Sequence, residues 1–232
     1  MMNKKVLVSV IVVVLLVIGG ITAFILLDNK NNRTSETENK AKEVLNNNTN
    51  NNEKKEDDNM DKKVLVVYFS HNGEQYNVGN VEVGNTAMVA SYIKEYLNCD
   101  SFEITPEVPY SKVYNDMLEI AKEEQRTNAR PKLKNALSNI DEYDTVFIGY
   151  PIWWGEIPNI VYTFLEEYNL DNKTIIPFNT HEGSGNAGTY GDLKTKLTNS
   201  NVNTNGLAIT GSTARTESGK EQTISWLKSL GY

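Results

Sequence analysis

The hydrophobic pattern divides the chain into three stretches. Residues 6–27 are apolar throughout and carry no charged side chain. Residues 28–62 are rich in Asn, Lys, Glu and Asp, and they include asparagine runs at 46–48 and 50–52. From residue 63 to residue 232, short apolar runs alternate with stretches of helical spacing. This last stretch, about 170 residues long, has the size and the pattern of one globular domain.

The alternation within residues 63–232 predicts five strands and five helices. Short apolar runs fit strands that are buried on both faces, and they lie at residues 63–69, 101–104, 144–150, 173–178 and 206–210. Apolar residues at helical spacing, such as Val89, Ile93 and Leu97, predict helices over residues 86–97, 110–127, 159–167, 188–197 and 217–230. This alternation is typical of an α/β fold with a doubly wound parallel sheet and helices on both faces.

The apolar stretch at residues 6–27 is long enough to cross a membrane. As a helix that rises about 1.5 Å per residue it spans roughly 33 Å, which matches a bilayer core. The short basic N-terminus, residues 1–5, favours an orientation with the domain outside the cytoplasm. A cleaved signal peptide is the alternative, but the apolar run continues past the poor cleavage site at Thr22-Ala23. We expect a single-pass signal-anchor and a disordered polar linker at residues 28–62.

Charge and cysteine content exclude two classes of function. The net charge is −7, and residues 63–232 contain no basic stripe of the kind that nucleic-acid binding requires. Cys99 is the only cysteine, and the two histidines lie far apart in the sequence. An internal disulfide and a Cys/His zinc site are therefore excluded, and we predict no metal site.

Polar loops follow the first predicted strand. Ligands of parallel sheets bind beyond the carboxyl ends of the strands. The run Ser70-His71-Asn72-Gly73 lies at this position, and Gly84-Asn85-Thr86 begins the next helix. Hydroxyls, amides and glycines before a helix suit an anion site, and an ordinary helix cap by Asn85 or Thr86 is the alternative.

Residues 74–83 separate these two runs. Tyr76, Val81 and Val83 alternate with polar residues around Val78-Gly79-Asn80. This pattern predicts a small hairpin inserted in the loop. Such a hairpin either covers a ligand or is a peripheral addition.

The loops after the third and fourth strands carry aromatic residues and glycines. In Pro151-Ile152-Trp153-Trp154-Gly155 the two adjacent tryptophans cannot both easily face a core. One of them is expected beside a cleft, where it suits a planar aromatic ligand, and packing of both beneath the loop is the alternative. In Thr180-His181-Glu182-Gly183-Ser184-Gly185 the glycines allow close approach to a ligand, and a plain flexible loop is the alternative. His181 is open to an acid–base role, with polar lining slightly favoured.

Together these loops resemble the flavodoxin family over residues 63–232. The motifs that carry the resemblance are, in order, Tyr68-Phe69-Ser70, Gly84-Asn85-Thr86, Asn128-Ala129-Arg130-Pro131, Gly149-Tyr150-Pro151-Ile152-Trp153-Trp154-Gly155 and Thr180-His181-Glu182-Gly183-Ser184-Gly185. The resemblance implies the strand order 2-1-3-4-5 and FMN as the cofactor.

The same resemblance implies roles for the site residues. The FMN phosphate would be held, without an arginine, by Ser70, His71, Asn72, Gly73, Asn85 and Thr86. The isoalloxazine ring would be lined by Pro151, Ile152, Trp153, Trp154 and Gly155, with one tryptophan against it and Gly155 at the position whose peptide flips in flavodoxins. The other edge of the ring would contact Thr180, His181, Glu182, Gly183, Ser184 and Gly185.

The sequence departs from the family pattern in three places. The phosphate loop is split by residues 74–83. Glu182 replaces a glycine and adds negative charge near the flavin, where it should disfavour an anionic reduced ring. The loop after the fourth strand lacks the tyrosine that many flavodoxins stack on the ring.

Three functions follow from these observations. The first is an FMN-dependent electron carrier that serves a redox partner protein or a small electron donor or acceptor. The second is an NAD(P)H-dependent quinone or flavin reductase on the same fold, although no nicotinamide fingerprint is visible. The third is a surface module without redox activity. No nucleophile–base pair or pair of carboxylates is evident, so we assign no catalytic residue.

Overall fold

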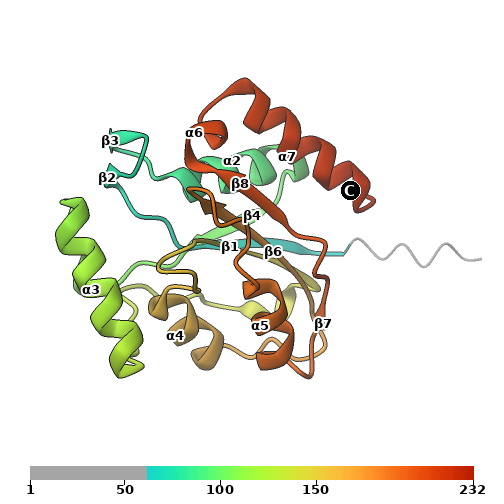
Figure 1. Cartoon of the computed structure of the whole chain (residues 1–232). Helices are drawn as coiled ribbons and strands as arrows, with labels where there is room; N and C mark the ends of the chain where they lie inside the picture. The colour runs from blue at the N-terminus through green and yellow to red at the C-terminus, as the bar shows by residue number, and fades with distance from the viewer. Residues whose placement is uncertain (1–61) are drawn as a thin grey trace, which may run out of the picture. The chain divides into compact units, whose positions relative to one another are not determined.

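The computed structural model describes residues 62–232, which fold around one parallel sheet (Figure 1). Its strands are β1 (Val64–Tyr68), β4 (Asp100–Glu103), β5 (Thr145–Pro151), β6 (Thr174–His181), β7 (Asn201–Val202) and β8 (Leu207–Thr210). The order is β4-β1-β5-β6-β7, with β8 also paired to β6, and all of these pairings are parallel. The predicted order 2-1-3-4-5 is confirmed, because β4, β1, β5, β6 and β8 are the five predicted strands.

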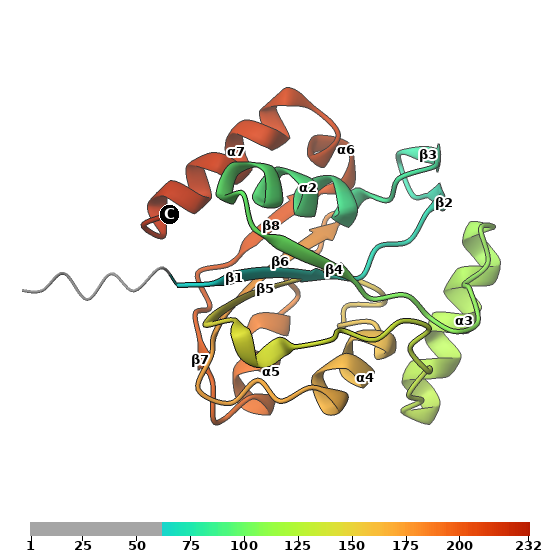
Figure 2. The same cartoon turned by 180° about the vertical axis from the view of Figure 1, so that it is seen from behind.

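Helices cover both faces of the sheet. One face packs against α3 (Tyr114–Thr127), α4 (Asn159–Glu167) and α5 (Thr189–Lys196), and a 3₁₀ turn, η1 (Ile140–Glu142), precedes β5. The other face packs against α2 (Asn85–Leu97), α6 (Gly211–Ala214) and α7 (Glu217–Ser229), as Figures 1 and 2 show. Successive residues of a strand point to opposite faces, so Val66 and Val67 of β1 are both fully buried, but in different core clusters. This arrangement explains the continuous apolar runs in the sequence.

The edge beside β6 is formed by two short strands where one was predicted. β7 pairs with Ile175, and β8 starts opposite Phe178. Pro177 lies between these positions and has no N–H group to offer to the ladder. The edge strand is therefore interrupted there.

The predicted insertion is a hairpin. β2 (Gly73–Gln75) pairs antiparallel with β3 (Gly79–Val81), and Figure 2 shows the pair projecting from the sheet beside α3. The helix predicted from residue 110 begins only at Tyr114. The backbone carbonyls just before Tyr114 instead accept hydrogen bonds from the hairpin and from His71. The Lys112 carbonyl accepts from the Glu74 amide at 2.9 Å, and the Ser111 carbonyl contacts the His71 ring at 2.8 Å.

The predicted signal-anchor at residues 6–27, and nearly all of the predicted linker at residues 28–62, lie outside the described residues. Among residues 62–232, no helix is both long enough and apolar enough to span a membrane.

Candidate functional site

A cavity of about 190 Å³ opens at the carboxyl ends of β5 and β6. Five separate segments meet there. The lining residues are Gln75 and Tyr76 of the hairpin, Asn85 of α2, Tyr114, Met117 and Leu118 of α3, residues 151–154 after β5, and residues 180–182 at the end of β6. The cavity thus combines an aromatic and aliphatic wall with a polar end at the start of α2.

The two tryptophans have different environments. Trp153 is 6% exposed and packs edge-on against Phe69 and Tyr110, whereas Trp154 is 53% exposed. Residues 153–156 form a tight turn in which Trp153 and Glu156 exchange two backbone hydrogen bonds. The φ angle is 50° at Trp154 and 80° at Gly155, a backbone conformation that a bulky side chain such as tryptophan rarely adopts. The expectation that one tryptophan lies at a cleft is confirmed.

Two hydrogen bonds fix this turn to α3. The Trp154 indole Nε1 donates to the Leu118 carbonyl at 3.0 Å, and Gln125 Nε2 donates to the Trp153 carbonyl at 2.7 Å. The Lys122 ammonium lies 5.9 Å from the Trp154 ring centroid. These contacts hold the strained turn in place, so the cavity wall is preorganised.

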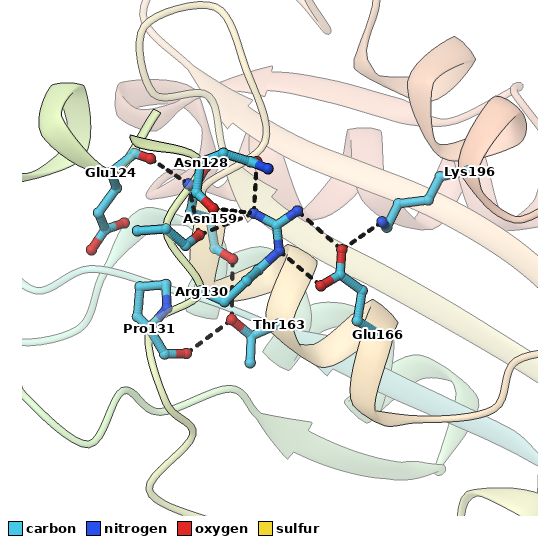
Figure 3. A network of polar contacts seen from close by, with 9 residues as sticks. Glu124, Asn128, Arg130, Pro131, Asn159, Thr163, Glu166 and Lys196 are labelled. Atoms are coloured by element: carbon cyan, nitrogen blue, oxygen red, sulfur yellow. Dashed lines mark hydrogen bonds and ion pairs between the residues drawn. The ribbon is translucent and has the colours of Figure 1, made fainter. Parts of the chain in front are cut away.

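The motif Asn128-Ala129-Arg130-Pro131 takes part in a network of polar contacts that joins α3, α4 and α5 (Figure 3). Arg130 makes a bidentate ion pair with Glu166 of α4 at 2.8 and 3.0 Å, and Lys196 of α5 joins it at 2.7 Å. Asn159 Nδ2 donates to the Glu124 and Ala129 carbonyls at 2.7 and 2.9 Å. The motif therefore clamps the end of α3 to α4, the helix that follows the tryptophan turn.

The loop after β6 contributes polar groups. His181 Nδ1 accepts from the Gly183 amide at 3.0 Å, so neutral His181 carries its proton on Nε2. Burial lowers the pKa of His181, which favours this neutral form. Glu182 Oε1 accepts from the Gly211 amide at 3.1 Å, and burial raises the pKa of this carboxyl group. The predicted acidic group, Glu182, therefore lies at the cavity, and its burial favours the protonated form.

The start of α2 presents unpaired backbone donors, next to the point where Asn85 lines the cavity. The Ala87 amide donates to Ser70 Oγ at 3.0 Å, whereas the Asn85 and Thr86 amides have no acceptor among residues 62–232. Arg215, from the turn after α6, donates to the Asn85 side-chain oxygen at 3.3 Å and to the Val83 carbonyl at 2.7 Å. Free amides at a helix N-terminus beside a guanidinium group suit an anion.

Comparison with known proteins gives the family. A family model described as flavodoxin matches residues 63–228, which is most of the chain. The chain belongs to the flavodoxin family. No curated protein matches this flavodoxin-family chain.

Solved structures of similar proteins agree with this assignment. A candidate flavoprotein from Bacteroides eggerthii has 30% sequence identity and a TM-score of 0.58, and the match covers 73% of this chain and 98% of that one. A second candidate flavoprotein, from Bacteroides uniformis, has 29% identity and a TM-score of 0.57 over 72% and 98% of the two chains. A flavoprotein in complex with FMN from Lactobacillus acidophilus shares the fold, with 22% identity and a TM-score of 0.51 over 66% and 95%.

The structure brings some of the expected flavodoxin site residues together and not others. Those that line the cavity are Asn85, Pro151, Ile152, Trp153, Trp154, Thr180, His181 and Glu182. Those that lie outside its lining are Ser70, His71, Asn72, Gly73, Thr86, Gly155, Gly183, Ser184 and Gly185. Thr86 turns inward and shares a 2.8 Å hydrogen bond with Thr180, which joins α2 to β6.

Residues at the first loop face a different space. Ser70, His71 and Asn72 line a second cavity of about 430 Å³ between the loops after β1 and β4. His71 Nε2 donates to the Ser111 carbonyl at 2.8 Å, and its Nδ1 accepts from Gln75 at 3.0 Å. Both ring nitrogens are therefore used to fix the base of the hairpin. The tryptophan turn lines the smaller cavity and does not line this second one.

Sequence reasoning missed several cavity residues. Tyr76, Tyr114 and Gln75 reach the cavity through the inserted hairpin and the start of α3. Arg215 lies outside the cavity lining, but it bonds to the lining residue Asn85 from 130 residues away. Nothing in the local sequence around Arg215 indicates this contact. For Tyr76, the only indication is the alternation of apolar and polar residues that predicts the hairpin.

Proposed function

We propose that this chain is an FMN-binding electron carrier of the flavodoxin family, held at a membrane by residues 6–27. The observation that carries the proposal is the cavity in which the tryptophan turn, the end of β6 and the start of α2 meet. Bound FMN would supply the redox chemistry by accepting and releasing electrons. The FMN complex of the Lactobacillus acidophilus flavoprotein supports this choice of cofactor.

The start of α2, where Asn85 borders the cavity, fits a phosphate group. The Asn85 and Thr86 amides lie at the positive end of the α2 dipole and have no acceptor among the described residues. Arg215 is held beside them by its bonds to Val83 and Asn85. These groups would bind the phosphate and orient the rest of the cofactor.

The apolar end fits a planar ring. Ile152, Trp154 and Leu118 provide wall area, and the hydrogen bond from Trp154 to Leu118 limits motion of that wall. A fixed aromatic wall excludes water from one side of a bound ring and costs little entropy on binding. The Nε2–H group of His181 offers a donor to a ring oxygen or nitrogen.

Electron transfer between proteins is favoured by the exposure of the site. Trp154 and Tyr76 are 53% and 55% exposed, so the cavity rim is accessible to a partner surface. The net charge of −7 suits a basic redox partner. The membrane tether would hold the domain close to a membrane-bound donor or acceptor.

The cofactor proposal is tested with the full chain purified in a mild detergent. FMN is added, excess is removed, and the visible spectrum is recorded during titration with a chemical reductant and, separately, with NADH or NADPH. We expect retained yellow FMN that the chemical reductant bleaches and the nicotinamides do not. Rapid bleaching by NADH or NADPH would establish the reductase alternative. If no FMN is retained, the remaining function is a surface module without redox activity.

The tether is tested by cell fractionation. We expect the full chain in the membrane fraction and a variant without residues 6–27 in the soluble fraction. External protease should digest the domain in cells whose membrane is intact but whose outer layers are permeable. Protection of the domain would refute the extracytoplasmic orientation.

A further inference from the structure

We propose that Tyr76, at the tip of the inserted hairpin, is a ring-binding residue that forms a second aromatic wall of the flavin site. This inference rests on the proposed function, because it assumes that a flavin ring occupies the cavity. The proposal assigns a role to the inserted residues 74–83. The tyrosine that many flavodoxins stack on the ring is absent here from the loop after β6, and Tyr76 would supply an aromatic contact from the hairpin.

The position of Tyr76 makes its ring available to a ligand in the cavity. Tyr76 lines the same 190 Å³ cavity as Trp154 and His181, although it lies on a different segment. Tyr76 is 55% exposed, and a large aromatic residue that borders a cavity is available to a ligand. Its ring stacks on Tyr114, with centroids 6.0 Å apart and an interplanar angle of 27°, so one face of the Tyr76 ring is backed by protein.

Hydrogen bonds anchor the hairpin at its base. Glu74 receives a hydrogen bond from the Tyr114 amide at 2.9 Å and donates its own amide to the Lys112 carbonyl at 2.9 Å. Gln75 is held by His71, whose other ring nitrogen is bonded to Ser111. The base of the hairpin is thus fixed to the segment before α3.

Close packing at Gly73 fixes the same base. Gly73 has a φ of 103°, and a Cβ atom there would lie 2.6 Å from the Lys112 carbonyl oxygen. Only glycine fits this approach, which brings the hairpin against α3. Because the base of the hairpin is fixed, Tyr76 at its tip loses little conformational freedom when a ring binds. More of the contact energy is then available for affinity.

The chemistry of these walls selects a planar aromatic heterocycle. Tyrosine and tryptophan stack on such rings, and the stacking is independent of any phosphate. Tyr76 should therefore contribute equally to binding of FMN, riboflavin and lumiflavin, which share the isoalloxazine ring. A residue at the phosphate end would affect FMN alone.

The experiment uses the full chain in mild detergent, with FMN, riboflavin and lumiflavin titrated into wild type and variants while flavin fluorescence is recorded. Tyr76→Leu should weaken all three ligands by a similar factor of roughly five to ten, and Tyr76→Phe should stay within about twofold of wild type. Tyr96→Leu is the matched control, because Tyr96 is 38% exposed on α2 and does not line the cavity. Far-ultraviolet circular dichroism and the melting temperature check that each variant is folded.

The outcomes separate this inference from the proposed function. If wild type binds FMN and Tyr76→Leu binds all three ligands as tightly as wild type, the role of Tyr76 is wrong and the cofactor proposal stands. A loss confined to FMN, or an equal loss in Tyr96→Leu, also overturns the role of Tyr76. If wild type binds none of the three ligands, the proposed function fails and this inference fails with it.

Discussion

Replacement of Arg215 by glutamine tests the phosphate end of the proposed site. Arg215 donates from Nη1 to Val83 and Asn85, and no carboxylate among residues 62–232 pairs with it. Its positive charge lies beside the positive end of the α2 dipole, so a bound anion would stabilise the arrangement. The change to glutamine removes the charge and leaves a polar side chain.

The expected magnitude follows from the contacts that remain available. A hydrogen bond to a charged group contributes about 1.5 to 3 kcal/mol. Arg215 is only half-buried, so solvent screening favours the lower end of that range. A loss of about 1.5 kcal/mol corresponds to a roughly tenfold weaker FMN complex. Riboflavin lacks the phosphate, and its affinity should not change.

The assay compares dissociation constants for FMN and riboflavin at low and moderate salt. Arg126→Gln is the matched control, since it removes the same charge from the exposed end of α3, where Arg126 pairs only with Glu123. We expect the ratio of the riboflavin to the FMN dissociation constant to fall about tenfold in Arg215→Gln and to stay unchanged in Arg126→Gln. The difference should shrink as salt increases.

Three results would refute this reasoning. Equal losses for FMN and riboflavin would mean that Arg215 supports the fold of the site and does not contact phosphate. If Arg215→Gln and Arg126→Gln weakened FMN binding equally, the loss would come from the change in net charge and not from a contact of Arg215. An unchanged FMN affinity would show that the α2 amides suffice.

Three further predictions concern stability. Hydrogen bonds from Arg130 and, to a lesser extent, Lys196 lower the pKa of Glu166 from 4.5 to about 2. The ionised Glu166 carboxylate therefore stabilises the fold fully above about pH 4.5, and this stabilisation is lost as the pH falls toward 2. Because the Glu166 side chain is 41% exposed, solvent screening reduces its contribution to the free energy of unfolding to about 1 kcal/mol. In urea unfolding, Glu166→Gln should be less stable than wild type at pH 7, and this difference should shrink in acid. A difference that is constant with pH would contradict this. Burial lowers the pKa of His71, so its folded form binds a proton less readily than its unfolded form, and wild type should lose stability as the pH falls below about 6.5. The melting-temperature gap between wild type and His71→Gln should therefore narrow between pH 7.5 and pH 5.5, and a gap that widens would disprove the assignment. Finally, a Cβ atom on Gly149 would lie 2.0 Å from Phe178 Cζ, so Gly149→Ala should lower the free energy of unfolding by about 1 to 3 kcal/mol or more. Gly191→Ala, where no atom lies within 4 Å, is the control that should cost nothing, and equal stability of the two variants would show that Phe178 moves freely.

The hydrophobic pattern by itself determined the main strands of the sheet, and the resemblance to flavodoxins supplied their order. β1 and β5 are read correctly because a strand buried on both faces must be apolar along its length. Asn159–Glu167 was predicted to the residue, since Pro158 begins the helix and its apolar face repeats at helical spacing. The tryptophan turn was also visible, because two adjacent large aromatic residues in a loop cannot both be buried.

Local spacing could not determine how the first loop is used. His71 and Asn72 stand where a phosphate site is expected, yet the hairpin between residues 73 and 83 turns His71 toward Ser111 and Gln75. The start of α3 moved from residue 110 to Tyr114 for the same reason. A side chain's partner depends on which segments approach it, and that depends on packing far along the chain.

The tertiary structure alone decided which residues meet at the cavity. Arg215 does not itself line the cavity, but it reaches the lining residue Asn85 across 130 positions because α6 packs on α2. Tyr76 reaches the same cavity as Trp154 only because Gly73 permits close packing of the hairpin against Lys112. Periodicity reports which face of an element is buried, so it identifies most of the strands and helices. The convergence of distant loops depends on how the sheet folds.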